Sequence, residues 1–383
     1  MKIGIDYTAA VWQGAGIGRY TRELIRAAIC QNKNYEYRLF FAAGGLDQQS
    51  PYVSDFKHLC REHANVHAIP IPLTPRRMTQ FWQRLRAPLP IEIFTGRLDL
   101  LYSPDFVLVP TRAPSILTVH DLSFYVYPEF AAQGMVRYLS DAVPRAVRRA
   151  DLVLADSQAT KNDMVRMMNA DPARILVVYP GVTDNFRVLT PEECQPVKQK
   201  FQLPEQFLVF VGTLSPRKNV VRLLEAFHRL TQQPQHADMH LVLVGQLGWL
   251  SDDIFTTITR LNLGQHVLWL DNVDDNDLPA VYNLARVSVY PSLYEGFGIP
   301  PLEAMACGTP VVTANNSSLP EAVGDAALMV FAEDVEALAS SIAQLLTHKD
   351  QWTRLRDAGL KRVRQFTWER AAMQLLDCYA RYN

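Results

Sequence analysis

Short apolar runs of β type alternate with polar or amphipathic helical stretches along most of the chain. Such alternation is typical of βα units, whose parallel strands form a sheet that helices cover. The pattern therefore predicts an α/β fold with mainly parallel sheets. We expect strands at residues 1–6, 37–42, 66–69, 99–102, 115–119, 152–155 and 175–178, and a second series at 207–211, 239–244, 266–270 and 286–290.

The chain is long enough for two domains. Its 383 residues exceed what one compact core usually holds. A polar segment that contains Pro191, Pro196 and Pro204 separates the two series of runs. We therefore place an N-terminal domain at residues 1–186 and a C-terminal domain at residues 187–366, with a last helical stretch at about 367–383.

Composition excludes several classes of protein. The chain has 38 basic and 39 acidic residues, whereas nucleic-acid-binding proteins carry a marked basic excess. Its five cysteines are scattered, without metal-ligand spacing, which indicates a reducing compartment. Asp6 interrupts the first apolar run, so we expect no signal peptide, and no apolar stretch reaches the roughly 18 residues of a membrane span. We expect a cytoplasmic protein.

Residues 286–310 combine a buried strand, a glycine loop and a short helix. Gly296 and Gly298 let the backbone approach a ligand closely, and the helix that follows offers free N–H groups to an anion. Two carboxylates, Glu295 and Glu303, flank these glycines. Because ionised carboxylates accept hydrogen bonds from sugar hydroxyls, the stretch suits a ligand with both phosphate and hydroxyl groups, such as a nucleotide sugar.

Two adjacent cations, Arg217 and Lys218, lie between a predicted strand at 207–211 and a predicted helix at 219–230. Loops at the carboxyl ends of parallel strands are where open α/β sheets bind ligands. Arginine binds phosphate oxygens in a bidentate manner and lysine acts as a point charge. Together with the two glutamates, the pair is predicted to neutralise a diphosphate.

Three features of the N-terminal half each allow a second interpretation. Gly16 lies in a glycine loop that either approaches a ligand or only forms a tight turn. His120 ends a predicted strand, and one interpretation is a structural role in which Asp121 orients it. The stretch 76–86, which begins with Arg76 and ends with Arg86, reads as an amphipathic basic helix. That helix suits an anionic membrane surface, or else packs on the core with a solvated basic face.

Several of these segments together resemble the retaining glycosyltransferases of family 4. The resemblance is strongest in residues 207–330, through the segment 211–227, the two glutamates separated by seven residues, and residues 317–321. It extends to the N-terminal glycine loop and to His120. It implies a GT-B fold, in which two Rossmann-like domains face each other across a cleft. The N-terminal domain would bind most of the acceptor, and the last helix would pack back onto it.

The resemblance also assigns roles to individual residues. It gives catalysis to His120, Arg217, Lys218 and Glu295. Arg217 and Lys218 would hold the diphosphate, Glu295 the sugar hydroxyls and Glu303 the ribose, with His120 beside the sugar. The donor site as a whole would comprise Gly16, Arg217, Lys218, Asn272, Val273, Glu295, Phe297, Gly298, Ile299 and Glu303, in which Asn272 and Val273 meet the base.

Two departures from the family pattern bear on the substrate. Thr213 stands where many relatives have arginine, and Asn219 stands where glycine often follows the lysine. The second variant is associated with mannosyl transfer in surface polysaccharide synthesis. The resemblance thus favours transfer of mannose from GDP-mannose, with a UDP-sugar as the other candidate donor, to a saccharide or polyprenyl-diphosphate-linked acceptor.

No metal site of the Asp-x-Asp type is evident in the sequence, so we expect neither a metal nor another cofactor, with the two cations taking the place of a metal. The resemblance implies retention of the anomeric configuration. Whether this occurs by front-face attack or through a covalent intermediate stays open, although no convincing nucleophile for the latter is evident. Two other functions also stay open, a nucleotide-sugar 2-epimerase of GT-B fold and a non-catalytic subunit that binds nucleotide sugar.

Overall fold

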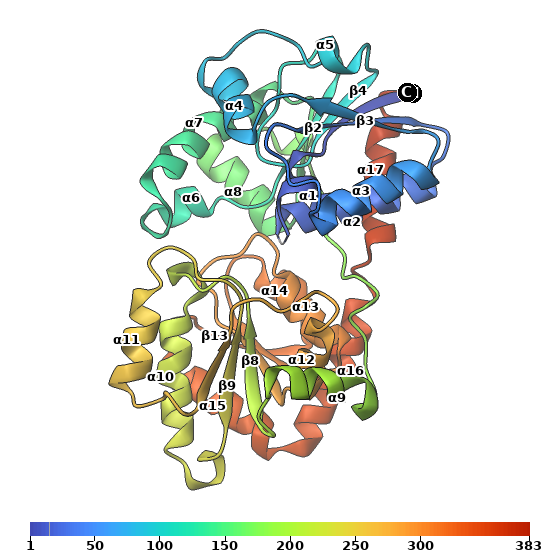
Figure 1. Ribbon diagram of the computed structural model, residues 1–383. Coiled ribbons are helices and arrows are strands. Elements are labelled where there is room, and N and C mark those ends of the chain that lie inside the picture. Colours follow the sequence, from blue (N-terminus) through green and yellow to red (C-terminus); the bar gives the residue numbers. More distant parts are fainter. Residues whose placement is uncertain (15) are drawn as a thin grey trace. The chain divides into compact units, whose positions relative to one another are not determined.

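The computed structural model describes residues 1–14 and 16–383, which form two compact units (Figure 1). Unit 1 comprises Met1–Leu122, Gly134–Gly181 and Trp368–Asn383, and unit 2 comprises Ser123–Gln133 and Val182–Thr367. Both units are built on parallel sheets flanked by helices, so the predicted α/β class is confirmed.

The sheet of unit 1 has seven strands in the order β3-β2-β1-β4-β5-β6-β7. Neighbouring strands pair in parallel throughout. Each run predicted in the first series forms a strand, because each is short, apolar and rich in β-branched or aromatic residues. The strands are β1 (Lys2–Asp6), β2 (Glu36–Ala42), β3 (Val66–Ile71), β4 (Leu100–Ser103), β5 (Ser115–Val119), β6 (Leu152–Ala155) and β7 (Ile175–Val177).

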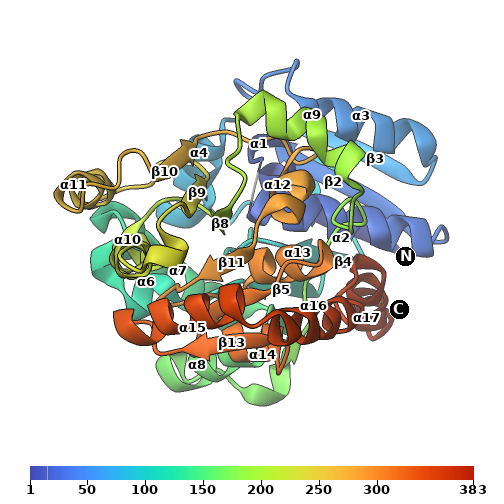
Figure 2. The ribbon, with the colours of Figure 1, turned by 90° about the horizontal axis from the view of Figure 1, so that it is seen from below.

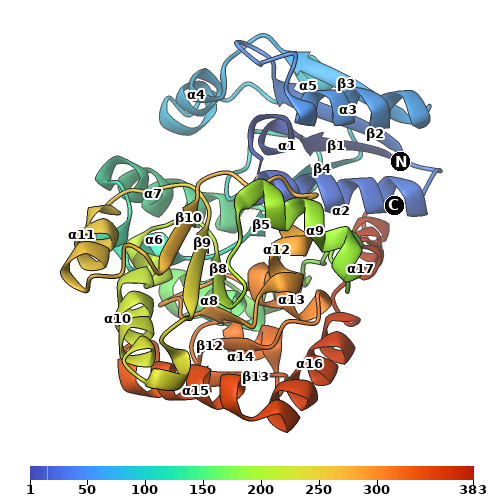
Figure 3. The ribbon, with the colours of Figure 1, turned by 60° about the horizontal axis from the view of Figure 1, so that its bottom comes forward.

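The last helix of the chain, α17 (Trp368–Ala380), belongs to unit 1. It packs against α2 (Ile17–Gln31), as Figure 3 shows, and buries Leu375 and Tyr379 in the same core as strands β1 and β4. The ring of Tyr379 lies edge-on to that of Tyr102, with centroids 5.9 Å apart. The other main helices of the unit are α1 (Thr8–Trp12), α3 (Pro51–Glu62), α5 (Glu92–Thr95), α7 (Gln133–Arg149) and α8 (Gln158–Met168).

The basic stretch 76–86 differs from the single amphipathic helix predicted for it. A short helix, α4 (Pro75–Met78), continues into a π-helix, η1 (Thr79–Arg84). Trp82 is buried and its indole N–H donates to the carbonyl of Leu89 over 2.8 Å, whereas Leu85 is 75% exposed. Because a π-turn closes over one more residue than an α-turn, Leu85 leaves the face that carries Trp82. The core-packing interpretation therefore holds for Trp82.

The sheet of unit 2 has six parallel strands in the order β10-β9-β8-β11-β12-β13. They are β8 (Phe207–Val211), β9 (His240–Val244), β10 (Val267–Leu270), β11 (Val287–Tyr290), β12 (Val311–Ala314) and β13 (Ala327–Val330). The last two strands, of four residues each, were not predicted. Both nevertheless extend the parallel ladder, and all four residues of β12 are buried.

Helices cover both faces of this sheet. The helix α10 packs against α11 and α15 (Figures 1 and 2). The polar segment after residue 186 holds a helix, α9, which begins at a capping box formed by Thr190 and Glu193 and has Pro191 in its first turn. The helices are α9 (Pro191–Phe201), α10 (Val220–Thr231), α11 (Asp252–Arg260), α12 (Leu278–Leu284), α13 (Ile299–Ala306), α14 (Leu319–Val323), α15 (Val335–Thr347) and α16 (Lys349–Val363).

None of the helices formed by residues 1–14 and 16–383 is both long and apolar enough to cross a membrane.

Candidate functional site

The carboxyl edge of the sheet in unit 2 carries the predicted anion-binding residues. Strands β8 and β11 are far apart in the chain but adjacent in the sheet, so the loops that follow them meet at one edge. The loop after β8 presents Arg217 and Lys218 from a short 3₁₀ turn, and the loop after β11 presents Glu295. The backbone N–H of Leu293 donates to the carbonyl of Arg217 over 2.9 Å and ties the two loops together.

The structure brings Arg217, Lys218 and Glu295 into one ion triad. Lys218 Nζ lies 2.7 Å from Glu295 Oε1, and Arg217 Nη1 lies 3.1 Å from Glu295 Oε2, so each carboxylate oxygen faces one cation. Glu295 is 7% and Lys218 is 9% exposed. Buried charges persist only when they are paired and hydrogen-bonded, which makes this triad a concentrated and costly arrangement of charge.

Tyr290, the last residue of β11, completes the triad's hydrogen bonds. Its hydroxyl accepts from Lys218 Nζ over 2.5 Å and donates to Glu295 Oε1 over 3.1 Å. Burial raises the pKa of Tyr290 well above its usual value, and the charge of Glu295 raises it further. The tyrosine is therefore a permanent hydrogen-bond donor to Glu295. Sequence reasoning missed it, because a tyrosine that ends an apolar run looks like any other core residue.

The two cations keep Glu295 ionised. Burial alone would raise the pKa of this carboxyl group, but the charges of Arg217 and Lys218 and a hydrogen bond from Lys218 outweigh it and lower the pKa to about 2. An ionised, acceptor-only carboxylate can receive hydrogen bonds from hydroxyl groups of a ligand.

The depressed pKa predicts a specific loss of stability in acid. A carboxyl group whose pKa is lower in the folded state than in the unfolded state stabilises the fold at pH values above its unfolded pKa, here 4.5. That contribution to the free energy of unfolding is lost as the pH falls through the folded pKa of about 2. The shift corresponds to about 3 kcal/mol at neutral pH, of which about 2 kcal/mol disappears by about pH 3. Urea unfolding of the wild type and of Glu295→Gln at both pH values tests this, since the difference between them should shrink in acid. A constant difference would contradict it.

The backbone of the Glu295 loop is clamped from two sides. The N–H of Glu295 donates to Ser317 Oγ over 3.0 Å, and Ser318 Oγ donates to the carbonyl of Glu295 over 2.9 Å. From the other side the Asn219 amide donates to the carbonyls of Pro291 and Ala332, over 3.0 and 2.7 Å. These contacts hold the backbone of Glu295 and of its loop in place.

Asn219 also explains one departure from the family pattern. Its φ of 62° lies in the left-handed region, which glycine adopts without strain and asparagine tolerates better than most residues. Asparagine thus keeps the backbone conformation that a glycine allows at this position. It adds one hydrogen bond to Pro291 in the loop that carries Glu295 and one to Ala332 in the segment after β13.

Gly298, at the start of α13, has a φ of 102°, and a Cβ atom there would lie 2.7 Å from Leu319 Cδ2. We expect Gly298→Ala to lower the free energy of unfolding by about 1–3 kcal/mol, because L side chains rarely adopt this conformation. Gly264→Ala is the matched control, since a Cβ atom there meets open space. Urea unfolding measures both variants, and equal stabilities would contradict the expectation.

The other residues of unit 2 that the family resemblance assigns to a donor site lie in distinct places. Phe297 is buried against Phe366, with ring centroids 5.3 Å apart, and Ile299 is half-buried at the first position of α13. Glu303 is 3% exposed inside α13 and accepts a hydrogen bond from the Tyr282 hydroxyl of α12 over 3.2 Å. The structure therefore pairs Glu303 with Tyr282, while Glu295 pairs with the two cations.

Asn272 and Val273 follow β10, two strands away from β8 on the same edge of the sheet. Asn272 is exposed and Val273 is half-buried. They share that edge with the triad, as expected for residues that contact another part of the same ligand.

In unit 1, Gly16 directly precedes α2 with φ 58° and ψ −124°, and a Cβ atom there would meet nothing within 4 Å. Backbone conformation, rather than crowding, requires glycine at this position. Ala15 of the predicted loop lies outside the described residues. The Arg22 guanidinium, which sequence reasoning missed, donates to the carbonyls of Ala10 and Gln13 over 2.7 and 2.6 Å and so fixes the preceding segment.

His120 directly follows β5 and is 8% exposed. Its Nδ1 lies 2.7 Å from Asp156 Oδ2, and its Nε2 lies 2.8 Å from the carbonyl oxygen of Pro104. The expectation that Asp121 orients the ring was wrong, since Asp156, at the end of the adjacent strand β6, is the partner. Ser157 caps α8 by accepting a hydrogen bond from the Thr160 N–H over 3.0 Å.

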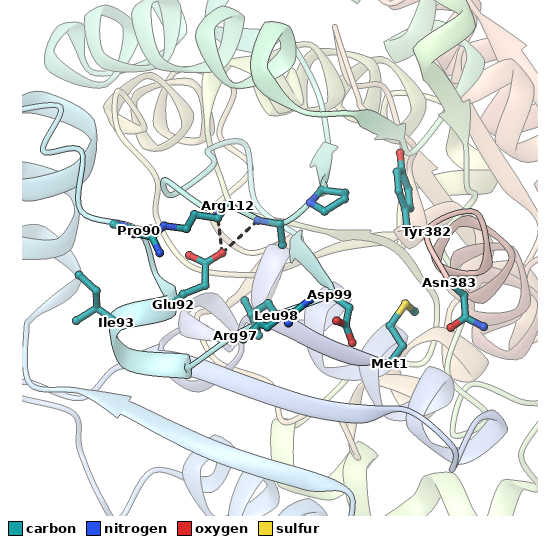
Figure 4. A pocket seen from close by; sticks show the side chains of 12 residues that line it. Met1, Pro90, Glu92, Ile93, Arg97, Leu98, Asp99, Arg112, Tyr382 and Asn383 are labelled. Atoms are coloured by element: carbon teal, nitrogen blue, oxygen red, sulfur yellow. Dashed lines mark hydrogen bonds between the residues drawn. The ribbon is translucent and has the colours of Figure 1, made fainter.

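A cavity of unit 1 lies at the opposite, amino edge of its sheet (Figure 4). It measures about 900 Å³, and Glu92 on its wall accepts hydrogen bonds from the backbone N–H groups of Arg112 and Ala113. None of the predicted site residues line it. Over residues 1–14 and 16–383, no three His, Cys, Asp or Glu side chains lie close enough together to hold a metal ion.

Comparison with known families covers nearly the whole chain. Residues 14–186 match the model described as glycosyltransferase family 4, and residues 192–362 match that of glycosyl transferases group 1. The O-antigen chain mannosyltransferase B of Escherichia coli is 35% identical over 380 residues, which are 95% of each chain. The serotype-specific mannosyltransferase WbdA of Escherichia coli is 30% identical over 237 residues, 61% of this chain and 29% of that protein.

Solved structures agree on the fold. The Anabaena protein Alr3699/HepE in complex with UDP and glucose has a TM-score of 0.76 at 21% identity, and the match covers 99% of both chains. WaaG, a glycosyltransferase involved in lipopolysaccharide biosynthesis, has a TM-score of 0.74 at 15% identity, with 99% of both chains covered.

Proposed function

The chain belongs to glycosyltransferase family 4 and has the GT-B fold, and we propose that it transfers mannose, with retention of configuration, from GDP-mannose to a saccharide acceptor. That it is a glycosyltransferase follows from its family. The donor, the stereochemical course, the acceptor and a role in O-antigen or related surface polysaccharide synthesis are the proposal.

The triad of Arg217, Lys218 and Glu295 is the observation that carries this proposal. Breaking the bond between the anomeric carbon and the phosphate oxygen leaves negative charge on the diphosphate and positive charge on the sugar. Arg217 and Lys218 are placed to stabilise the departing diphosphate, and such preorganised charge commonly contributes several kcal/mol to catalysis. Glu295 is placed to accept hydrogen bonds from the sugar hydroxyls.

The donor must compete with Glu295 for the two cations. Both cations contact the same carboxylate, so a diphosphate that reaches them replaces part of those contacts. The displaced carboxylate oxygens become available to the sugar hydroxyls. Binding of the diphosphate and binding of the sugar are thereby coupled through one side chain.

Two observations favour mannose over other sugars. The relative with 35% identity over 95% of both chains is named an O-antigen mannosyltransferase. Asn219 carries the variant associated with mannosyl transfer, and its anchoring contacts account for that substitution structurally. A UDP-sugar is the second candidate donor, because the Anabaena structure holds UDP and glucose.

The test is incubation of the full chain with GDP-mannose or UDP-glucose and a mannose-terminated oligosaccharide, followed by mass spectrometry of the acceptor. We expect a gain of one hexose with GDP-mannose, an α linkage by NMR, and no change of rate on adding EDTA. Epimerisation of the donor incubated alone would support the 2-epimerase instead. Donor binding without turnover, whichever acceptor is supplied, would support the non-catalytic subunit.

A polyprenyl-diphosphate-linked acceptor would bring the enzyme to a membrane, and we propose that the exposed side chains of Arg76, Arg77, Arg84 and Leu85 make that peripheral contact. Each basic residue near an anionic surface contributes about 1 kcal/mol. The triple variant Arg77→Ser/Arg84→Ser/Leu85→Ser should therefore lower co-sedimentation with phosphatidylglycerol vesicles about tenfold or more. Trp82 is left unchanged because it is buried.

The control for the membrane test is Arg148→Ser/Arg149→Ser, which removes two exposed arginines elsewhere in unit 1. It should bind vesicles more strongly than the triple variant. Equal binding by the wild type and the triple variant would remove the membrane role of this stretch.

A further inference from the structure

Each ring nitrogen of His120 lies within hydrogen-bond distance of an oxygen atom that can accept a hydrogen bond from a protonated nitrogen. The carbonyl oxygen of Pro104, 2.8 Å from Nε2, can only accept, so Nε2 must carry a hydrogen. Asp156 Oδ2 lies 2.7 Å from Nδ1. This leaves two arrangements, an imidazolium ring beside a carboxylate, or a neutral ring beside a protonated carboxyl group.

The packing around His120 fixes the ring in one orientation. The rings of Tyr20 and Phe106 meet it edge-on, with centroids 4.7 and 5.4 Å away. Thr160 Oγ1 donates to the carbonyl oxygen of His120 over 3.2 Å and holds its backbone. A ring that is clamped in this way and bonded at both nitrogens cannot turn to present either nitrogen elsewhere.

The charged groups around the ring favour the imidazolium. Asp156 faces it from the end of β6, Asp105 from the loop after β4, and Asp121 is the next residue in the chain. Burial lowers the pKa of His120, but the charges of Asp156 and Asp105 and the two hydrogen bonds outweigh it and raise the pKa to about 9. The phenol of Tyr20 stays neutral, since burial raises its pKa well above the usual value.

We propose that Asp156 is a positioning residue for sugar transfer, which holds His120 as a doubly hydrogen-bonded imidazolium at the carboxyl end of β5. The inference rests on the proposed function for its catalytic consequence. His120 then supplies a fixed positive charge, and it neither takes nor delivers a proton at neutral pH.

The dependence of the two residues on each other is mutual. Asp156 Oδ1 is buried and has no hydrogen-bond partner among the described residues, so the bond to His120 is what compensates the carboxylate. Leaving a buried charge without its partner is costly. Replacing Asp156 by asparagine keeps the shape of the side chain while removing the charge that sustains the imidazolium.

The direct test is NMR of the full chain labelled with ¹⁵N-histidine, with the His120 signals assigned through His120→Gln. In the wild type at neutral pH we expect both ring nitrogens to be protonated and the ring to titrate near pH 9. In Asp156→Asn the ring should lose its proton below its ordinary value of 6.5, because burial then dominates. Asp156→Glu should restore the protonated ring in part.

Kinetics supply a readout that a purely structural role would not move. In Asp156→Asn we expect kcat at neutral pH to fall about tenfold or more, with a smaller change in donor KM, and activity to recover as the pH is lowered and the ring regains its proton. In the wild type, activity should fall as the pH rises through about 9. Asp55→Asn, at an exposed position in the same unit, is the control and should behave as wild type.

A neutral His120 ring in the wild type at neutral pH would overturn the inference. So would an Asp156→Asn variant that keeps both the nitrogen signals and kcat of the wild type. Failure of the proposed function looks different, because the wild type itself would then transfer no sugar while the nitrogen signals still report the protonation of His120.

Discussion

Replacing Lys218 by alanine is expected to lower the rate of transfer at saturating donor about 10²–10³-fold, the usual cost of losing one preorganised group that stabilises developing charge. Lys218 Nζ contacts both Glu295 and Tyr290 in a buried position, so no water or mobile side chain readily replaces it. Arg217 keeps Glu295 paired through its 3.1 Å contact, which should allow the variant to fold. Initial rates with GDP-mannose measure the effect.

Lys361→Ala is the matched control, because Lys361 is an exposed lysine on α16 of the same unit. It should transfer at the wild-type rate. Circular dichroism and thermal unfolding establish that Lys218→Ala is folded. A folded Lys218→Ala variant with a rate within about threefold of the wild type would show that the buried lysine does not stabilise the leaving group.

Glu295→Gln is expected to separate binding from turnover. The variant removes the carboxylate that holds both cations, so a nucleoside diphosphate should bind more tightly, by about tenfold, or about 1.4 kcal/mol. Transfer should nevertheless fall by about 10²-fold or more, because the amide accepts hydroxyl hydrogen bonds less strongly than the ionised carboxylate. Calorimetric titration with GDP and the transfer assay give the two quantities.

The control for this variant is Glu333→Gln, at an exposed glutamate elsewhere in unit 2. It should leave both binding and transfer unchanged. Weaker binding of GDP by Glu295→Gln than by the wild type would mean that the carboxylate supports the cations instead of competing with the ligand.

Local pattern predicted the strands well, because buried parallel strands are short, continuous apolar runs. It failed where two signals conflicted. The strand β12 (Val311–Ala314) follows Gly308 and Pro310 so closely that the helix stop hid it. The helix α9 begins at Pro191, and its prolines suggested a linker, although a proline in the first turn is compatible with a helix. The stretch with the π-helix at Thr79–Arg84 has the pattern of an ordinary amphipathic helix, which does not reveal the wider turn.

The site could be predicted in its residue types but not in its pairings. Strand β11 inserts beside β8, and this strand order, which no local pattern encodes, brings Glu295 to Arg217 and Lys218. Likewise β5 and β6 are neighbours, which places Asp156 against His120 where the sequence suggested Asp121. Contacts across adjacent strands depend on register and tertiary order, and both are invisible in a single sequence without an alignment.

The central claim is that Arg217 and Lys218 bind the diphosphate of the donor, and titration calorimetry with GDP-mannose tests it most directly. The account predicts saturable binding to the wild type and to the control Lys361→Ala/Arg364→Ala, whose replaced side chains are exposed. It predicts binding at least about 100-fold weaker in a folded Arg217→Ala/Lys218→Ala variant. Equal affinity in that variant and in the wild type would contradict it.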